Sequence, residues 1–311
     1  MAGMLQQVKS RLVRLGPNHG LVQAALKFHC LRHGYKVRFL AGRIMLRKAN
    51  RELVLNNAQY VQVPIMLECF DLFFSTVEAE QRGGLLTLDF SEPGLHRYTK
   101  SQTSFHFPSI PEDDVMDAYT YRHMPKPGDV VWDVGAHAGA TTYFLSQMVG
   151  PEGRVYAFEP DDLNYEYLLR NIELHQLQNV SAIKKALAGS TGTADFNMDG
   201  TMSAGLSEFL VYSDKQLFKK VPIMSLPDAC NEFGETPSYI KMDIEGAEVA
   251  VVEGARDFLR SNRIHFAIES YHRIGGELTC AILERLFSEI GYEVNSSDRF
   301  VQMFTWGTPT N

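Results

Sequence analysis

Two short segments place carboxylates where parallel strands are expected to end. One reads Ile240-Lys-Met-Asp-Ile-Glu-Gly-Ala-Glu248 and sets Asp243 and Glu245 directly before Gly246. Two carboxylates so close repel each other unless they are used, and Gly246 permits a tight exit from a strand into a helix. Asp243 and Glu245 are therefore candidates for orienting a substrate or accepting its proton. The competing interpretation is that both residues cap a helix that begins near Ala247.

The other segment, Asp129–Pro160, is a short apolar run, a glycine-rich turn, a helical pattern and a second apolar run. Asp133 stands just before the turn, and Glu159 with Pro160 closes the second run. The turn consists of Gly135, Ala136, His137, Ala138 and Gly139. A strand-loop-helix-strand unit of this kind holds a nucleoside-bearing cofactor at the carboxyl ends of parallel strands.

His137 separates the two classes of cofactor that use such a unit. Dinucleotide binders need glycine at this middle position so that the backbone can approach the pyrophosphate. The side chain of His137 obstructs a pyrophosphate but not a smaller amino-acid tail, so the sequence favours S-adenosylmethionine over NAD. The ammonium of S-adenosylmethionine can contact Asp133 or nearby carbonyls, and its carboxylate can lie at the helix N-terminus beside Gly139. Its ribose hydroxyls can donate hydrogen bonds to Glu159. His137 itself is either a catalyst or a residue that stabilises the loop by hydrogen bonding.

Strands and helices alternate strictly from residue 113 onward, which predicts a mostly parallel, doubly wound sheet. Ala186 and Leu187, at the end of the third strand, are expected to flank the adenine through their backbone. The predicted strands cover 129–134, 154–158, 180–187, 238–243 and 264–269, followed by a closing hairpin over 292–295 and 300–306. The predicted helices cover 115–123, 140–148, 162–175, 248–261 and 279–290, and a β-rich insertion has strands near 193–197 and 218–224.

The first 112 residues follow a different pattern and are predicted to form an N-terminal accessory or substrate-capping region before a catalytic domain over 113–311. Apolar residues at helical spacing predict helices over 4–15 and 20–33 and a buried helix over 63–77. Alternating residues predict two or three strands within 35–55 and one over 85–90. The turn-rich stretch 91–112 is interpreted as the boundary.

Charge is distributed unevenly along the chain. Residues 1–50 contain ten Lys or Arg and no Asp or Glu, whereas the remainder contains 20 basic and 37 acidic residues. This basic arm predicts contact with an anionic membrane surface or a lipid-phosphate substrate, or else a solvated surface docked on an acidic body. The acidic body and the absence of a motif for flipped bases make a nucleic-acid substrate a weaker option.

Cysteine usage and hydropathy indicate a cytoplasmic protein. The four cysteines form no C-x-x-C pair, which favours reduced thiols. No apolar run approaches the roughly 20 residues of a membrane span, and the longest near the start is too short for a signal peptide.

Four segments together resemble the FkbM family of S-adenosylmethionine-dependent methyltransferases. They are Val131–Gly139, Phe158–Pro160, Ile240–Glu248 and Val252–Gly254, within a resemblance that covers roughly residues 113–275. The glycine loop is shared by all class I methyltransferases, and the segment Ile240–Glu248 is more specific. The resemblance implies a seven-stranded Rossmann-like sheet with an antiparallel last strand, and methylation of hydroxyls on sugars, glycolipids or natural products. Residues 1–112 fall outside this resemblance, so the family does not indicate which acceptor the chain methylates.

Methyl transfer needs a group that positions the acceptor hydroxyl and accepts its proton. Asp243 is the primary candidate, Glu245 and His272 come next, and Lys241 would balance the acids. One alternative is a divalent metal shared by Asp243 and Glu269, which would lower the pKa of the hydroxyl. An NAD-dependent oxidoreductase and a non-catalytic cofactor-binding member of the fold are the other functions left open.

Overall fold

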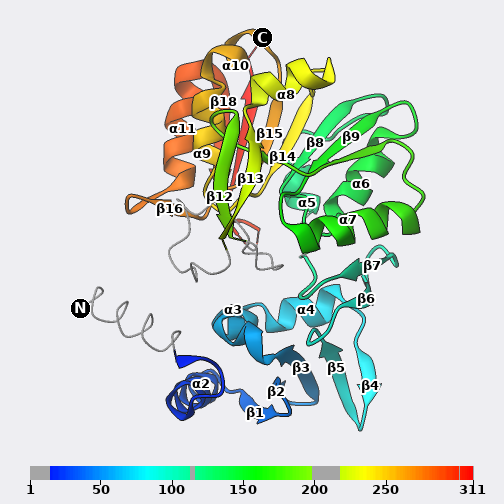
Figure 1. The fold of residues 1–311 in the computed structure, drawn as a ribbon, viewed down its shortest axis with the longest axis vertical. Helices are drawn as coiled ribbons and strands as arrows, with labels where there is room; N and C mark the ends of the chain where they lie inside the picture. Colours follow the sequence, from blue (N-terminus) through cyan, green and yellow to red (C-terminus); the bar gives the residue numbers. More distant parts are fainter. Residues whose placement is uncertain (1–14, 113–115, 198–217, 301, 311) are drawn as a thin grey trace. The chain divides into compact units, whose positions relative to one another are not determined.

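The computed structural model describes residues 15–112, 116–197, 218–300 and 302–310. The chain divides into two compact units, Met1–Asp114 and Val115–Asn311 (Figure 1). The predicted helix over 4–15 lies outside the described residues except for Leu15. No helix among the described residues is long and apolar enough to cross a membrane.

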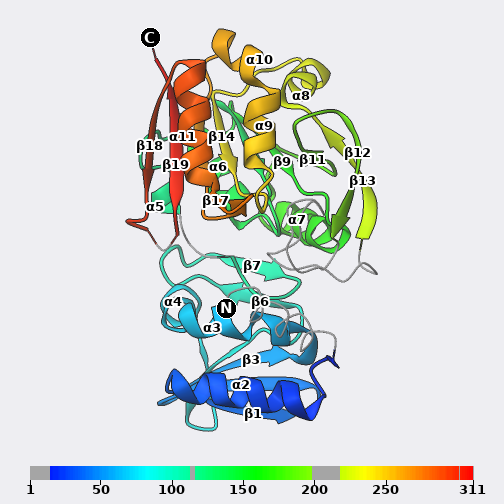
Figure 2. The same ribbon diagram turned by 90° about the vertical axis from the view of Figure 1, so that its left-hand side faces the viewer.

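The first unit contains a five-stranded sheet in the order β1-β2-β3-β5-β4. Its strands are β1 (Lys36–Leu40), β2 (Arg43–Lys48), β3 (Arg51–Asn56), β4 (Glu80–Arg82) and β5 (Leu85–Asp89), and the separate hairpin is β6 (Gly94–Arg97) with β7 (Ser104–Phe107). Its helices are α2 (Gly20–Arg32), η1 (Asn57–Gln62), α3 (Val63–Glu68) and α4 (Phe70–Thr76). Figure 2 shows α2 running alongside β1.

Alternating residues decide which face of this sheet is buried. Ile44 and Leu46 of β2 are fully buried, which is the period-two pattern of a strand with one face in the core. In β3, Leu53, Val54 and Leu55 are buried in succession. The guanidinium of Arg51 lies 5.6 Å from the ring centroid of Phe70 and so ties α4 to β3. The predictions of a helix over 20–33, strands within 35–55 and a strand over 85–90 are confirmed.

Two predictions for the first unit are wrong in detail. The helix expected over 63–77 is two helices that meet at Cys69, whose backbone (φ −89°, ψ 6°) ends α3. The stretch 91–112 is not merely turn-rich, because it contains the β6–β7 hairpin, and Tyr98, Phe105 and Phe107 are buried there. Local sequence pattern missed the hairpin because proline and glycine surround its short strands.

The second unit is built on a seven-stranded sheet in the order β10-β9-β8-β14-β15-β19-β18. Its strands are β8 (Val130–Val134), β9 (Arg154–Phe158), β10 (Val180–Ile183), β14 (Tyr239–Met242), β15 (His265–Glu269), β18 (Tyr292–Ser297) and β19 (Phe304–Pro309). The first five strands pair in parallel, and β19 is antiparallel to both β15 and β18. The prediction of a Rossmann-like, mostly parallel sheet with an antiparallel last strand is therefore confirmed.

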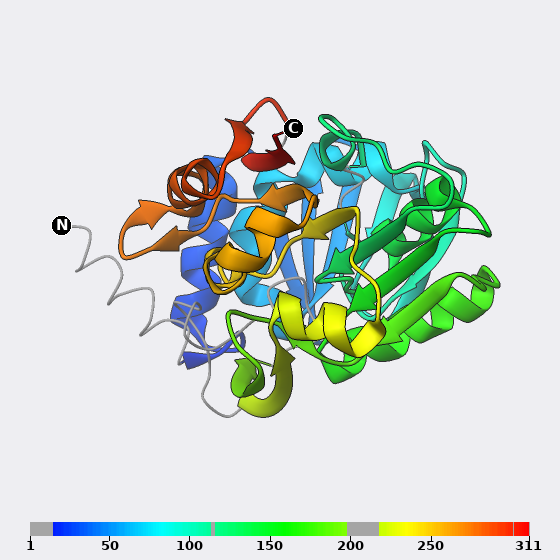
Figure 3. The same cartoon turned by 90° about the horizontal axis from the view of Figure 1, so that it is seen from above.

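Helices cover both faces of this sheet. They are α5 (Met116–Tyr119), α6 (Ala140–Val149), α7 (Asp162–Leu174), α8 (Leu226–Phe233), α9 (Glu248–Gly254), α10 (Arg256–Ser261) and α11 (Thr279–Ile290). Residues of α8, α9, α10 and α11 share one apolar core with the sheet, and residues of α5 and α6 share another. Figure 3 shows the green helices α6 and α7 on one side of the strands and the gold and orange helices α9 and α11 on the other.

A smaller three-stranded sheet, in the order β11-β13-β12, confirms the predicted β-rich insertion. Its strands are β11 (Ala186–Leu187), β12 (Gly192–Asn197) and β13 (Phe218–Met224), and a two-residue hairpin, β16 (Arg273–Ile274) with β17 (Glu277–Leu278), follows β15. The strand predicted over 180–187 is thus divided, because β10 ends at Ile183 and β11 pairs with β13 instead. The helix predicted over 248–261 is likewise two helices, α9 and α10.

Candidate functional site

The glycine loop and the acidic segment after β14 touch each other. The backbone N–H of Asp243 donates to the carbonyl of Val134 over 3.0 Å, which extends the parallel pairing of β14 and β8 to the strand ends. Gly135 has a φ of 80°, and a Cβ at that position would lie 1.9 Å from the carbonyl oxygen of Asp243. Only glycine fits at this position, because it adopts the positive φ and has no Cβ to clash with the carbonyl of Asp243.

Asp133 is fully buried and its carboxylate is engaged within the protein. Oδ1 lies 3.0 Å from Nζ of Lys241, and Oδ2 accepts a hydrogen bond of 2.6 Å from the hydroxyl of Thr142. Nζ of Lys241 also donates to the carbonyl of Gly135 over 2.7 Å. Through this hydrogen bond, the Asp133–Lys241 pair holds Gly135, the first glycine of the loop, in place. A cofactor ammonium would have to compete with Lys241, so the direct contact expected for Asp133 stays a prediction.

Glu159 holds the turn that contains His137. Oε2 of Glu159 accepts the backbone N–H of His137 over 2.8 Å, and Oε1 accepts the N–H of Asp161 over 2.8 Å. His137 has a φ of 47°, in the left-handed region that a middle glycine would otherwise supply. Burial raises the pKa of Glu159 to about 7, although its two N–H donors act in the opposite direction. The carboxyl is thus poised between its two protonation states near neutral pH.

The turn after β14 is held by Glu248 rather than by the two acids before it. Oε1 of Glu248 accepts the N–H of Ile244 over 2.8 Å and that of Gly246 over 3.3 Å. The N-cap of α9, Ala247, has no side-chain capping bond. The interpretation of Asp243 and Glu245 as helix caps is therefore wrong.

Asp243 and Glu245 differ in what they contact. Oδ1 of Asp243 is buried and has no hydrogen-bond partner among the described residues. Oε2 of Glu245 lies 3.1 Å from Nε2 of His272, which reaches the turn from the loop after β15. Glu245 also has a φ of 59°, and a left-handed backbone at a non-glycine residue costs about 1–2 kcal/mol. The fold therefore leaves one carboxylate oxygen free beside a charged pair.

His272 is an imidazolium at neutral pH. Burial by itself lowers the pKa of the ring, but the hydrogen bond to Glu245 and the charges of Glu248, Glu245 and Asp243 outweigh it and raise the pKa to about 9. A protonated ring donates hydrogen bonds and balances negative charge, but it does not accept a proton. Among the three candidates for the proton acceptor, this leaves Asp243 as the one with an unengaged oxygen.

Glu269, the last residue of β15, is bound by a side chain of the helix α5. Its Oε1 accepts a hydrogen bond from the hydroxyl of Tyr119 in α5. The described residues contain no group of three or more His, Cys, Asp or Glu side chains that could hold a metal ion. The alternative of a divalent metal between Asp243 and Glu269 gains no support from this geometry.

The remaining predicted cofactor residues are buried. Ala136 packs against Ala157 and Leu168, and Pro160 is buried directly after Glu159. Leu187 lies in the main apolar core with its side chain turned away from solvent. The expected contact of Ala186 and Leu187 with an adenine through their backbone is untested and stays a prediction.

Two residues that hold this site were missed from the sequence. No role was predicted for Glu248, although an acid two residues after a strand-exit glycine is placed to accept backbone N–H groups. Thr142 is the third residue of α6, and nothing in the local sequence indicates that it reaches back to Asp133. Such a contact depends on how α6 crosses β8.

Comparison with known proteins points to one family. The model of the methyltransferase FkbM domain matches residues 133–294, just over half of the chain. The hexuronic acid methyltransferase AglP of Haloferax volcanii is 27% identical over 146 residues, which are 46% of this chain and 56% of that protein. Methyltransferase 1 of Beauveria bassiana is 26% identical over 157 residues, which are 44% of this chain and 63% of that protein. The chain thus spans less than two thirds of these curated relatives.

One solved structure with this family name is similar to the chain. It is the methyltransferase FkbM from Methylobacillus flagellatus, with 18% sequence identity and a TM-score of 0.44. The alignment covers 60% of this chain and 45% of that one.

Proposed function

The chain belongs to the FkbM methyltransferase family, and we propose that it transfers the methyl group of S-adenosylmethionine to a hydroxyl oxygen of a sugar, glycolipid or natural product. The observation that carries this proposal is the contact between Gly135 and Asp243. It brings the glycine loop next to Asp243, whose Oδ1 has no hydrogen-bond partner among the described residues.

The residues at the sheet edge suit this cofactor. Glu159 keeps lone pairs that can accept ribose hydroxyls while its backbone N–H bonds hold it in place. The N-terminus of α6 offers unpaired N–H groups to a carboxylate, and its N-cap, Gly139, has no side chain in the way. His137 stands where a pyrophosphate would need glycine, which supports S-adenosylmethionine over NAD.

Asp243 would orient the acceptor hydroxyl and take its proton as the oxygen–methyl bond forms. When bound, the cofactor supplies an electrophilic methyl group on a sulfonium, and the residues of the chain provide position and charge. Oε2 of Glu245 lies 3.1 Å from Nε2 of His272, so Glu245 would take no part in the proton transfer. The positive charge of His272 would balance the negative charge of Glu245.

A sugar acceptor is supported by the relative from Haloferax volcanii that is named as a hexuronic acid methyltransferase. A screen with methyl-labelled S-adenosylmethionine over sugars, glycolipids and phenols tests this acceptor class. The first unit would then help to select the acceptor, because it lies outside the matched residues 133–294.

Substitution of Asp243 separates chemistry from binding. Asp243→Asn should reduce methyl transfer by about 10²–10⁴-fold, the usual contribution of a positioned proton acceptor, while calorimetry finds S-adenosylmethionine affinity nearly unchanged. Glu235→Gln, at an exposed pair with Arg154, is the matched control and should leave transfer intact. Full activity in Asp243→Asn would refute the role of this carboxylate.

A further inference from the structure

One face of α2 exposes large apolar side chains to solvent. Leu21, Phe28 and Leu31 are 63%, 64% and 72% exposed, whereas Val22 and Cys30 on the opposite side are buried. Spacings of seven and three residues place Leu21, Phe28 and Leu31 on one side of a helix with 3.6 residues per turn. We call these three residues the α2 stripe. Large apolar side chains that gather on one exposed helix face are a feature of contact sites.

Exposed basic side chains lie on α2 and on the neighbouring strand β1. Lys27 and Arg32 lie on α2, Lys36 and Arg38 lie on β1, and all four are exposed. Within the described part of the chain, none of the four forms an ion pair, although Arg43, Lys48 and Arg51 nearby do. The guanidinium of Arg32 lies 5.7 Å from the ring centroid of Phe28, so cation and apolar group are direct neighbours.

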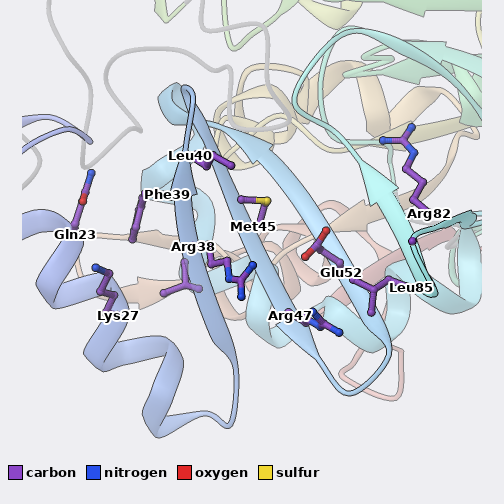
Figure 4. Close-up of a pocket in the computed structure, with 12 residues that line it drawn as sticks. Gln23, Lys27, Arg38, Phe39, Leu40, Met45, Arg47, Glu52, Arg82 and Leu85 are labelled. Carbon is purple, nitrogen blue, oxygen red and sulfur yellow. The ribbon is translucent and has the colours of Figure 1, made fainter.

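A shallow groove of about 680 Å³ lies beside α2 in the same unit (Figure 4). Lys27 reaches it from α2, Arg38 from β1 and Arg47 from β2, and Glu52 is the acidic residue that lines it. The apolar part of the lining consists of Val37, Phe39, Leu40, Met45 and Leu85, and Gln23, Arg82 and Gly83 also line the groove. Leu40 at the end of β1 is itself 66% exposed. Cations beside apolar side chains match an ionised headgroup attached to hydrocarbon.

We propose that the first unit binds peripherally to an anionic lipid bilayer, with α2 lying in the plane of the interface. The α2 stripe enters the boundary of the acyl chains, and Lys27, Arg32 and Lys36 meet the headgroups. A helix of 13 residues is too short to span the bilayer. Charge favours lipid over a second copy of this chain, because two such basic surfaces repel each other. The inference does not depend on methyl transfer.

Co-sedimentation of the full chain with sucrose-loaded vesicles tests this surface. The wild-type chain should partition onto vesicles of phosphatidylcholine with phosphatidylglycerol and much less onto phosphatidylcholine alone. A variant with Leu21→Gln, Phe28→Gln and Leu31→Gln should lose about a hundredfold or more in partition coefficient. A variant with Lys27→Gln, Arg32→Gln and Lys36→Gln should also lose about a hundredfold, since each cation contributes about fivefold near an anionic surface.

The matched control changes three exposed apolar residues of the same unit that lie outside α2. Val61, Ile65 and Leu95 are 50%, 47% and 54% exposed, and their replacement by Gln should leave partition unchanged. Circular dichroism and thermal unfolding check that every variant is folded. Wild-type chain that stays in the supernatant with anionic vesicles would overturn the inference. So would equal partition of the stripe variant and the control, or a dimer that the stripe variant dissociates without any vesicle binding.

Discussion

The buried pair of Asp133 and Lys241 offers a test of how the glycine loop is held in place. The two side chains are 0% and 4% exposed, with Oδ1 and Nζ 3.0 Å apart. Lys241→Met keeps most of the apolar stem and removes the charge, which leaves a carboxylate that is shielded from solvent. Breaking a buried pair from one side costs about 3–5 kcal/mol of unfolding free energy.

The expected loss of unfolding free energy is limited because Asp133 can take up a proton and become neutral when Lys241 is removed. An aspartate with an ordinary pKa near 3.9 pays about 1.4 kcal/mol per pH unit to be neutral, which is about 4 kcal/mol at pH 7. The hydroxyl of Thr142 still donates to Asp133 and reduces the loss, so we expect about 3 kcal/mol at pH 7. At pH 5 the protonation of Asp133 costs only about 1.5 kcal/mol. The loss of unfolding free energy in Lys241→Met should therefore become smaller as the pH falls.

Urea unfolding followed by tryptophan fluorescence measures this loss in the second unit alone. The two tryptophans of the chain, Trp132 and Trp306, are both buried in that unit. Lys185→Met is the control, because its pair with Glu232 is solvent-exposed and worth less than about 1 kcal/mol. A loss in Lys241→Met no larger than in the control, or one that does not change with pH, would show that the buried pair does not hold the loop in place. Adding Asp133→Asn to Lys241→Met should recover more than half of the loss.

Three further predictions follow from the same site. Gly135→Ala should abolish S-adenosylmethionine binding in calorimetry, because its Cβ would meet the carbonyl of Asp243 at 1.9 Å. Gly150→Ala shares the strain of a positive φ, 65°, but has open space around its Cβ, so folded protein with this substitution should bind normally. The dissociation constant for S-adenosylmethionine should rise up to about tenfold per pH unit below pH 7, because ribose hydroxyls favour an ionised Glu159 and its pKa is about 7; Glu159→Gln should bind weakly with no such slope. The pKa of His272 is raised to about 9 in the folded chain, so its contribution to stability is complete below about pH 6.5 and is lost as the pH rises through 9. Urea unfolding at pH 6 and pH 9.5 should show that loss in wild type and a smaller one in His272→Gln; equal losses would contradict the charge assigned to the ring.

The central sheet could be predicted from the sequence because its elements are encoded locally. Strands such as β8 and β14 are short apolar runs that end in acids, and α11 carries Leu283, Leu286 and Ile290 on one face. These patterns do not depend on distant residues. Asp243 and Glu159 could be named as candidates for the same reason, since each directly follows a strand, β14 and β9.

Errors in the prediction occurred where tertiary contacts decide the outcome. The helix expected over 248–261 ends early at Gly254, where a Cβ would lie 2.1 Å from the carbonyl oxygen of Gly189. That close approach joins α9 to the loop after β11, and no local pattern contains it. The interpretation of Asp243 and Glu245 as helix caps was wrong because Glu248 is folded back onto the turn.

The choice of cofactor is the most direct test of the proposed function. Calorimetric titration of the full chain with S-adenosylmethionine, and separately with NAD, reports which ligand the loop at Gly135–Gly139 accepts. We expect saturable one-to-one binding of S-adenosylmethionine, weakened strongly by Glu159→Gln, and no binding of NAD. Binding of NAD without S-adenosylmethionine, or no binding of either by folded protein, would contradict the assignment.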